Sequence, residues 1–191
     1  HRYKWIINKE PDKHLYLISD RIIKASKTKN TKVLFLSEFD KIVFDSVHSL
    51  HNIDSIMVDP KADLSIEHDN INQALILDEF NNDNVSHLIT KYGTFDIIVC
   101  CRLLEHCADL NKFVNLLNNL LAVDGSIIFE VPDSTKSLIQ GDIAMLWEEH
   151  ICYFTPESLR LELDSLGYIL KDYIIYRYPQ EDAIIGMFNR S

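Results

Sequence analysis

The sequence predicts an α/β fold: a doubly wound, mostly parallel sheet with helices on both faces and an antiparallel edge strand. From residue 32 onward, short apolar runs alternate with segments of helical spacing, and such alternation is typical of parallel sheets covered by helices. The last two apolar runs, residues 168–176 and 183–188, are separated only by a loop. Consecutive strands joined in this way are antiparallel, so an antiparallel edge is expected.

One domain is expected, because 191 residues suffice for a substantial hydrophobic core. In this prediction residues 1–30 form a helical lead-in and residues 31–191 form the α/β core. The chain begins with His1 rather than Met and shows no signal-peptide pattern. We therefore expect it to be a piece of a longer sequence.

The composition argues against several kinds of partner. Hydrophobic residues make up 47% and charged residues 25% of the chain, which is ordinary for a soluble globular protein. The formal net charge of −10 argues against a nucleic-acid backbone or an anionic membrane as the main partner. No apolar run approaches the roughly 20 residues that a membrane span needs. The expected partner is a small-molecule substrate, and the sequence leaves the oligomeric state open.

The first half of the chain shows the alternation element by element. Residues 9–26 have helical spacing, with their apolar side chains on one face. That face carries Leu15, Ile18, Ile22 and Ile23. The next expected elements are strands at 32–36, 55–58 and 74–77, and helices at 41–51 and 84–92, the last of which ends at Gly93.

The second half gives clearer signals. Residues 95–101 form an apolar run, as expected for a strand buried on both faces. Asp109 can cap a helix whose apolar residues recur every three or four positions. Further on, Thr155 and Pro156 supply a cap and a first-turn proline. The remaining elements are a strand at 126–131 and a helix that closes at Gly167.

Glycine usage excludes two kinds of nucleotide site. The chain has five glycines, where about 13 would be average at roughly 7%. The first of them is Gly93. A P-loop or a glycine-rich dinucleotide fingerprint in the first half is therefore excluded.

The cysteines indicate a reducing compartment. None of the four forms a CxxC pair, and two are adjacent at the end of an expected strand. This is no disulfide framework, so a cytoplasmic location is predicted. The pairs His106-Cys107 and His150-Cys152 are conceivable zinc ligands. Their spacing matches no standard ligand pattern, and no metal site is expected.

The expected strand ends mark a candidate pocket, because ligands of such sheets bind outside the carboxyl ends of the strands. Asp59 ends the second strand, where a carboxylate can accept hydrogen bonds from two ribose hydroxyls. The alternative for Asp59 is a turn former before Pro60. For Asp78 and Glu79 the alternative is a solvated loop. The full set of pocket positions is Ser37, Glu38, Phe39, Asp59, Asp78, Glu79, Cys101, Arg102, Pro132 and Asp133.

The most informative segment is the Glu149-His150 pair with Tyr153 and Phe154 close behind it. It offers a proton acceptor, an orienting carboxylate and ring faces in one loop. Proton-transfer chemistry on a small polar substrate needs this combination. The alternative is a loop whose aromatic residues cap the sheet and whose histidine is hydrogen-bonded and inert.

Several segments resemble the second half of class I S-adenosylmethionine-dependent methyltransferases. They are residues 95–99, 104–110, 120–125 and 128–132. Residues 149–155 resemble the Glu-His-x-x-Tyr-Phe-Ser/Thr signature of the sugar C-methyltransferase branch, in which the matching histidine acts as base. Residues 178–182 are similar to a subgroup of that branch tied to surface-polysaccharide genes. The resemblance implies a Rossmann-like fold and S-adenosylmethionine as cofactor.

The first half departs from the pattern of that family. When Val33 is aligned with the start of the cofactor motif, Phe35 stands where an acidic residue is usual. Ser37, Phe39 and Lys41 then stand where the family has three glycines. Side chains at these positions should narrow or fill the space for the methionine part of the cofactor. Asp59 fits the ribose-binding acid, so half of the nucleoside site is kept.

The leading hypothesis is a methyltransferase that acts on a small molecule, with a nucleotide-linked sugar as the substrate class that the resemblance implies. His150 is the candidate base, Glu149 would orient it, and Tyr153 would contact the substrate. Arg102 or Glu105 would line the pocket wall. Two alternatives stay open: a methyltransferase fold that serves as a binding or scaffold module without catalysis, and a related domain that uses another nucleotide.

Overall fold

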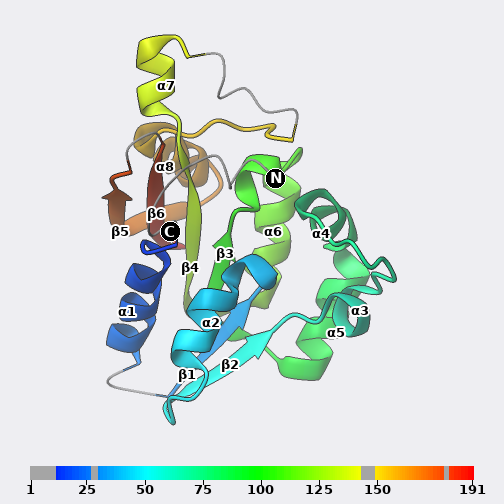
Figure 1. Cartoon of the computed structure of the whole chain (residues 1–191). Coiled ribbons are helices and arrows are strands. Elements are labelled where there is room, and N and C mark those ends of the chain that lie inside the picture. Colours follow the sequence, from blue (N-terminus) through cyan, green and yellow to red (C-terminus); the bar gives the residue numbers. More distant parts are fainter. Residues whose placement is uncertain (1–11, 27–29, 143–148, 179–180) are drawn as a thin grey trace.

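The computed structural model describes residues 12–26, 30–142, 149–178 and 181–191. Pro179 and Gln180, from the tail segment noted above, lie outside these ranges. The strands within them are β1 (Thr31–Phe35), β2 (Ile53–Met57), β3 (Phe95–Cys101), β4 (Leu121–Asp133), β5 (Tyr168–Tyr176) and β6 (Asp182–Arg190). They form one sheet in the order β2-β1-β3-β4-β6-β5 (Figure 1). Strands β1 to β4 are parallel to one another, and β6 is antiparallel to β4 and β5. The predicted fold class, a mostly parallel sheet with an antiparallel edge, is confirmed.

Helices cover both faces of this sheet (Figure 1). The α-helices of the described ranges are α1 (Leu15–Ala25), α2 (Lys41–Val47), α3 (Pro60–Leu64), α4 (Gln73–Glu79), α5 (Asn82–Tyr92), α6 (Leu110–Leu120), α7 (Thr135–Gln140) and α8 (Pro156–Ser165). Two short 3-10 turns, η2 (Glu38–Asp40) and η3 (Leu104–His106), follow the ends of β1 and β3. Both turns lie at the carboxyl edge of the sheet.

The strands divide the core into two clusters, because successive side chains of a strand point to opposite faces. Val33 and Phe35 pack with the buried side chains of α1 and α2. Leu34, between them, packs in the larger cluster with residues of α5, α6 and α8. A strand buried on both faces needs a continuous apolar run, which is the pattern that predicted β1.

The predicted lead-in helix is present as α1 in the part of the chain that the structure describes. Leu15, Ile18 and Ile22 are buried, as their shared face predicted. Residues 9–11 of the predicted span lie outside the described residues. Because α1 packs against α2 and the sheet, the lead-in belongs to the same core as the strands.

The predicted strand at residues 74–77 is wrong, since this segment is helix α4. The side chain of Asn72 caps the helix by accepting a hydrogen bond from the Leu75 N–H at 2.9 Å. Ile76 and Phe80, four residues apart, are both buried in the larger cluster. A short apolar run fits a strand and a buried helical turn equally well, and only the packing decided between them. The sheet therefore ends at β2.

None of the described helices is long and apolar enough to cross a membrane.

Candidate functional site

The loop after β1 is closed by one of its own side chains. Ser37 caps η2, and its hydroxyl accepts a hydrogen bond from the Phe39 N–H at 3.3 Å. The carboxylate of Asp40 accepts hydrogen bonds from the backbone N–H groups of Ser37 at 3.1 Å and Cys101 at 2.9 Å. Asp40 thus joins the ends of β1 and β3. Sequence reasoning missed it, although Ser37 and Asp40 have the spacing of a capping box.

The Asp40 side chain is completely buried, and this burial sets the protonation state of its carboxyl group. Desolvation raises the pKa of the carboxyl from 3.8 to about 7, while the hydrogen bonds from Cys101 and Ser37 act in the opposite direction. Burial also raises the pKa of the Cys101 thiol well above its usual range, so this cysteine stays protonated and inert.

A pocket of about 440 Å³ lies at the carboxyl end of β2 and contains Asp59. The Oδ1 atom of Asp59 accepts hydrogen bonds from the N–H groups of Lys61 (2.9 Å) and Ala62 (2.8 Å), which caps α3. Its Oδ2 atom has no hydrogen bond to the described residues, so it can accept one from a ligand. The pocket is lined by Glu38, Lys41, Phe44, Met57, Val58, Asp59, Pro60, Ile71 and Ile76.

Asp78 and Glu79 do not follow a strand, so the reason for placing them at the sheet edge is wrong. Asp78 lines a separate pocket of about 190 Å³ between α4 and the start of α6. The backbone carbonyl of Glu79 accepts a hydrogen bond from the Asn84 side chain at 2.8 Å. Neither residue lines the pocket of Asp59.

Arg102 follows β3 in a left-handed conformation, with φ at 56°. Such a conformation is uncommon for a residue with a side chain and is typical of functional or strained sites. Its Nη2 atom donates to Asp12 Oδ1 at 2.7 Å, and its Nε atom lies 3.8 Å from Glu130 Oε2. Arg102 therefore belongs to a network of charges at the carboxyl ends of β3 and β4.

The buried centre of that network is Glu130, which sequence reasoning missed. Its Oε1 atom lies 2.8 Å from His14 Nε2, and the other ring nitrogen of His14 lies 2.7 Å from the Tyr178 hydroxyl. A charged residue inside the apolar run of β4 was the available signal for Glu130. His14 is 116 positions away along the chain, and no local pattern links the two.

The loop that carries His150 is hydrogen-bonded to η3. The N–H groups of Ile151 and Cys152 both donate to the Glu105 carbonyl, at 2.8 and 2.9 Å. The His106 Nδ1 atom lies 2.7 Å from the Glu149 carbonyl oxygen and donates to it, because a carbonyl can only accept. The structure therefore places the Glu149-His150 segment against η3, the turn that follows β3.

Two imidazoles and one carboxyl group meet at this contact. The rings of His106 and His150 are perpendicular, with centroids 4.8 Å apart. The carboxyl group beside them belongs to Glu105, whereas the Glu149 side chain is exposed. The ring of Tyr153 is 6.1 Å from that of His150. Among the predicted residues, His150 and Tyr153 come together, and Glu149 contributes through its backbone.

Burial sets the protonation of this cluster. Desolvation, and next the charge of Glu130, raise the pKa of Glu105 to about 8. Desolvation, with a smaller contribution from His106, lowers the pKa of His150 to about 4. Near pH 7 the buried carboxyl is therefore mostly protonated and His150 is neutral. A histidine with so low a pKa is a weak base.

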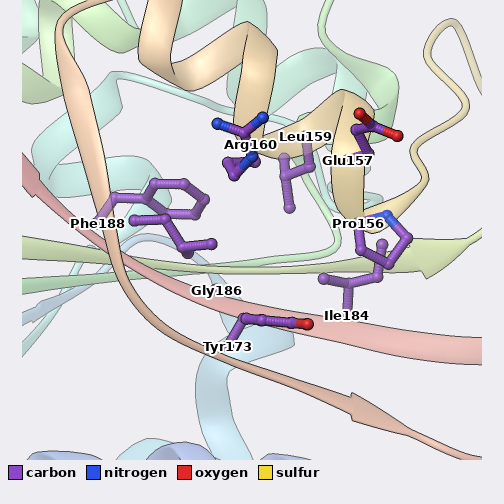
Figure 2. Close-up of a pocket in the computed structure, with 9 residues that line it drawn as sticks. Pro156, Glu157, Leu159, Arg160, Tyr173, Ile184, Gly186 and Phe188 are labelled. Atoms are coloured by element: carbon purple, nitrogen blue, oxygen red, sulfur yellow. The ribbon is translucent and has the colours of Figure 1, made fainter.

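A further pocket, of about 310 Å³, lies between α8 and strands β5 and β6 (Figure 2). Apolar side chains of the strands, such as Ile184 and Phe188, form its floor, and Glu157 and Arg160 reach it from α8. None of the residues named above as cofactor or catalytic candidates lines it. The chemistry-bearing residues gather instead at the carboxyl edge of the sheet.

Comparisons with known proteins agree with the fold of this chain. Three solved structures share the fold at 11–18% sequence identity. Magnesium protoporphyrin IX methyltransferase from Synechocystis PCC 6803, with bound SAH, has a TM-score of 0.56 at 11% identity, over 100% of this chain and 93% of that chain. The Burkholderia thailandensis 1,6-didemethyltoxoflavin-N1-methyltransferase, with its substrate and S-adenosylhomocysteine bound, has a TM-score of 0.58 at 12% identity, over 100% and 84%.

The third structure, a SAM-dependent methyltransferase from Archaeoglobus fulgidus, has a TM-score of 0.52 at 18% identity, over 91% of this chain and 94% of that chain. A sequence search of curated proteins finds no match. The family model described as "Methyltransferase domain" matches residues 29–170, which is most of the chain. The chain therefore belongs to the methyltransferase domain family.

Proposed function

We propose that this protein is an S-adenosylmethionine-dependent methyltransferase that acts on a small molecule. The observation that carries the proposal is the pocket at the end of β2. Asp59 offers a carboxylate oxygen there beside the apolar side chains of Ile71 and Ile76. A carboxylate for ribose hydroxyls next to apolar walls for a purine is what a nucleoside needs.

The residues present fit the nucleoside part of the cofactor. Asp59 Oδ2 and Glu38 would accept hydrogen bonds from the ribose, and Met57 and the two isoleucines would cover the adenine ring. The cofactor supplies a methyl group on a sulfonium, and its transfer is an in-line displacement. The protein's main task is therefore to position the acceptor and to exclude water.

The side of the site where the methyl-accepting molecule would bind is rich in carboxyl groups that can accept hydrogen bonds. Glu105 and Glu130 are buried at the carboxyl ends of β3 and β4, and Glu181 is close enough that its charge affects the pKa of Glu105. An acceptor molecule that carries hydroxyl or amine donors matches these groups. Together with the resemblance of residues 149–155 and 178–182, this supports a nucleotide-linked sugar of surface-polysaccharide biosynthesis as the acceptor class.

A second candidate function rests on Asp40. Its carboxylate accepts hydrogen bonds from the N–H groups of Ser37 and Cys101. This is the turn where the family's glycines let the backbone approach the methionine part of the cofactor. A fold with this turn closed would serve as a binding or scaffold module without methyl transfer. Cofactor binding therefore separates the two candidates.

The test is thermal melting with and without S-adenosylhomocysteine. At a ligand concentration 100 times Kd, binding to the folded state alone adds about 2.7 kcal/mol. That corresponds to about 5–10 °C in the melting midpoint of a chain of this size. An unchanged midpoint at millimolar ligand overturns the methyltransferase proposal and supports the scaffold candidate.

Calorimetry on two variants then tests the site itself. Asp59→Ala should weaken S-adenosylhomocysteine binding by about 1.5–3 kcal/mol, the usual size for hydrogen bonds to a charged group. Asp54, an exposed carboxylate on β2, the strand that precedes Asp59, provides the matched control, and Asp54→Ala should leave the affinity unchanged. Equal affinities in the two variants would remove Asp59 from the site.

A further inference from the structure

Three metal-ligating side chains meet beyond the end of β3. One ligand atom from each of Glu105, His106 and His150 lies within 4.8 Å of the other two. Sequence spacing had paired the two histidines with Cys107 and Cys152. The structure brings the histidines together with a glutamate instead, and the Cys152 thiol is 3.6 Å from the Cys107 carbonyl.

The ligand atoms of Glu105 and His106 are buried and have no partner among the described residues. Both carboxyl oxygens of Glu105 and the Nε2 atom of His106 lack a hydrogen bond to this part of the chain, although the two residues are only 1% and 8% exposed. Leaving such groups unpaired costs about 1–3 kcal/mol each. Buried polar atoms without partners in a native fold therefore call for an explanation, such as an ion.

The tautomer of His106 is already the one that a metal requires. Its Nδ1–H donates to the Glu149 carbonyl at 2.7 Å, so in the neutral ring the lone pair is on Nε2. Metal-ligating histidines usually donate their second nitrogen to a carbonyl or carboxylate in this way, which fixes the ring. The free lone pair of His106 faces Glu105.

The distance between the His106 nitrogen and the nearest Glu105 oxygen is too long for a hydrogen bond and suits a cation between them. His106 Nε2 and Glu105 Oε1 are 3.9 Å apart. Ligands of one zinc ion lie about 2.0–2.1 Å from it, so two of them stand about 3.3 Å apart in a tetrahedron and at most about 4.1 Å apart. A movement of roughly 1 Å by the side chains, mainly that of the half-buried His150, would close the set.

We propose that Glu105, His106 and His150 bind one divalent transition-metal ion, for which Zn²⁺ is the best match. Two imidazoles and one carboxylate are a known ligand set for zinc sites that keep an open position for water or substrate. The surrounding charge favours a cation, since Glu130 and Glu181 both lie near Glu105, while the charge of Arg102, whose Nε atom is 3.8 Å from Glu130 Oε2, acts in the opposite direction.

This site does not depend on the proposed methyl transfer, because it rests on the three side chains alone. It does change the role of His150. A nitrogen that holds a metal is not available to take a proton, so His150 is a ligand rather than a base. The open position would face the edge where the acceptor is proposed to bind.

The test is zinc binding by the whole chain after it is stripped with a chelator. Competition with a chromophoric chelator should show one ion per chain. Glu105→Gln and His150→Asn should each weaken the affinity by more than about 100-fold, because even an outer-shell partner is worth about 10–100-fold. Glu105→Gln keeps the side-chain shape, and circular dichroism should confirm that both variants fold.

His87 provides the matched control. Its Nε2 atom lies 3.8 Å from Asp63 Oδ1, nearly the same spacing, but the His87 side chain is about half exposed and Lys91 already binds that oxygen at 2.7 Å. His87→Asn should leave zinc affinity unchanged. Co²⁺ in place of Zn²⁺ should give visible d–d bands without a strong thiolate charge-transfer band.

Three results would overturn the proposal. They are the absence of saturable binding at one ion per chain, an affinity that survives both Glu105→Gln and His150→Asn, and a thiolate band that places the metal on a cysteine. If one of the two variants fails to fold, the other still decides. Zinc binding with no response to S-adenosylhomocysteine would keep this site and reject the proposed function.

Discussion

The buried Asp40 should make the folded protein less stable as the pH rises. Replacing Asp40 by asparagine should remove this pH dependence. The carboxylate is fully buried between the ends of β1 and β3, where two backbone N–H groups donate to it. Burial raises its pKa from 3.8 to about 7. Between these pH values the folded protein keeps a proton that the unfolded chain has lost. The free energy of unfolding therefore falls as the pH rises through this window.

The magnitude follows from the gap between the two pKa values. About 3 pH units at about 1.4 kcal/mol per unit give about 4 kcal/mol, lost between pH 3.8 and about pH 7. About 3 kcal/mol of this falls above pH 5. Asp40→Asn has no group to titrate there, but its amide NH₂ faces one of the two N–H donors, which costs about 1–2 kcal/mol. The variant should be less stable than the wild type at pH 5 and more stable at pH 8.

Urea unfolding of both proteins from pH 5 to pH 8 measures this effect. The difference between the two curves cancels every other group that titrates in the same range. Asp45→Asn is the control, since Asp45 is half exposed on α2 and pairs with Lys41 at 3.0 Å. That variant should differ from the wild type by less than about 0.5 kcal/mol at each pH. If the difference in unfolding free energy between the wild type and Asp40→Asn stays constant with pH, the reasoning is refuted.

Two further variants test the network and the loop. His14→Leu leaves Glu130 buried without its partner, which should cost about 3–5 kcal/mol and lower the melting midpoint by about 10 °C. The exposed His48→Leu should change it little, and equal midpoints in the two variants would contradict this. If His150 is a base, His150→Asn should lower turnover by about 10²–10⁴-fold with zinc affinity unchanged. If it is a metal ligand, zinc affinity falls as well.

The fold could be predicted because its signals are local and repeated. A run as long and as rich in β-branched residues as 95–101 is typical of a strand buried on both faces. The caps at Asp109 and Thr155 mark the starts of α6 and α8 where the structure has them. The segment at 74–77 was the exception. Four apolar residues cannot show a period, so its helix depended on what packs against Ile76.

The site could be predicted only in part. Asp59 lines a pocket, and His150 and Tyr153 lie near each other. These positions could be predicted because a strand end and a short loop are marked by local sequence patterns. The partners of these residues were not readable. His14 reaches Glu130, and Glu105 meets His150, across long separations in sequence.

The sequence by itself determined the α/β sheet and the order of most elements. It did so because apolar periodicity and caps act over a few residues. Only the tertiary structure decided which charged groups are buried together. It placed Asp40 under the β1 turn and left the Glu105 oxygens facing His106. These pairings depend on desolvation and on distances between segments far apart in the chain, and no local pattern encodes either.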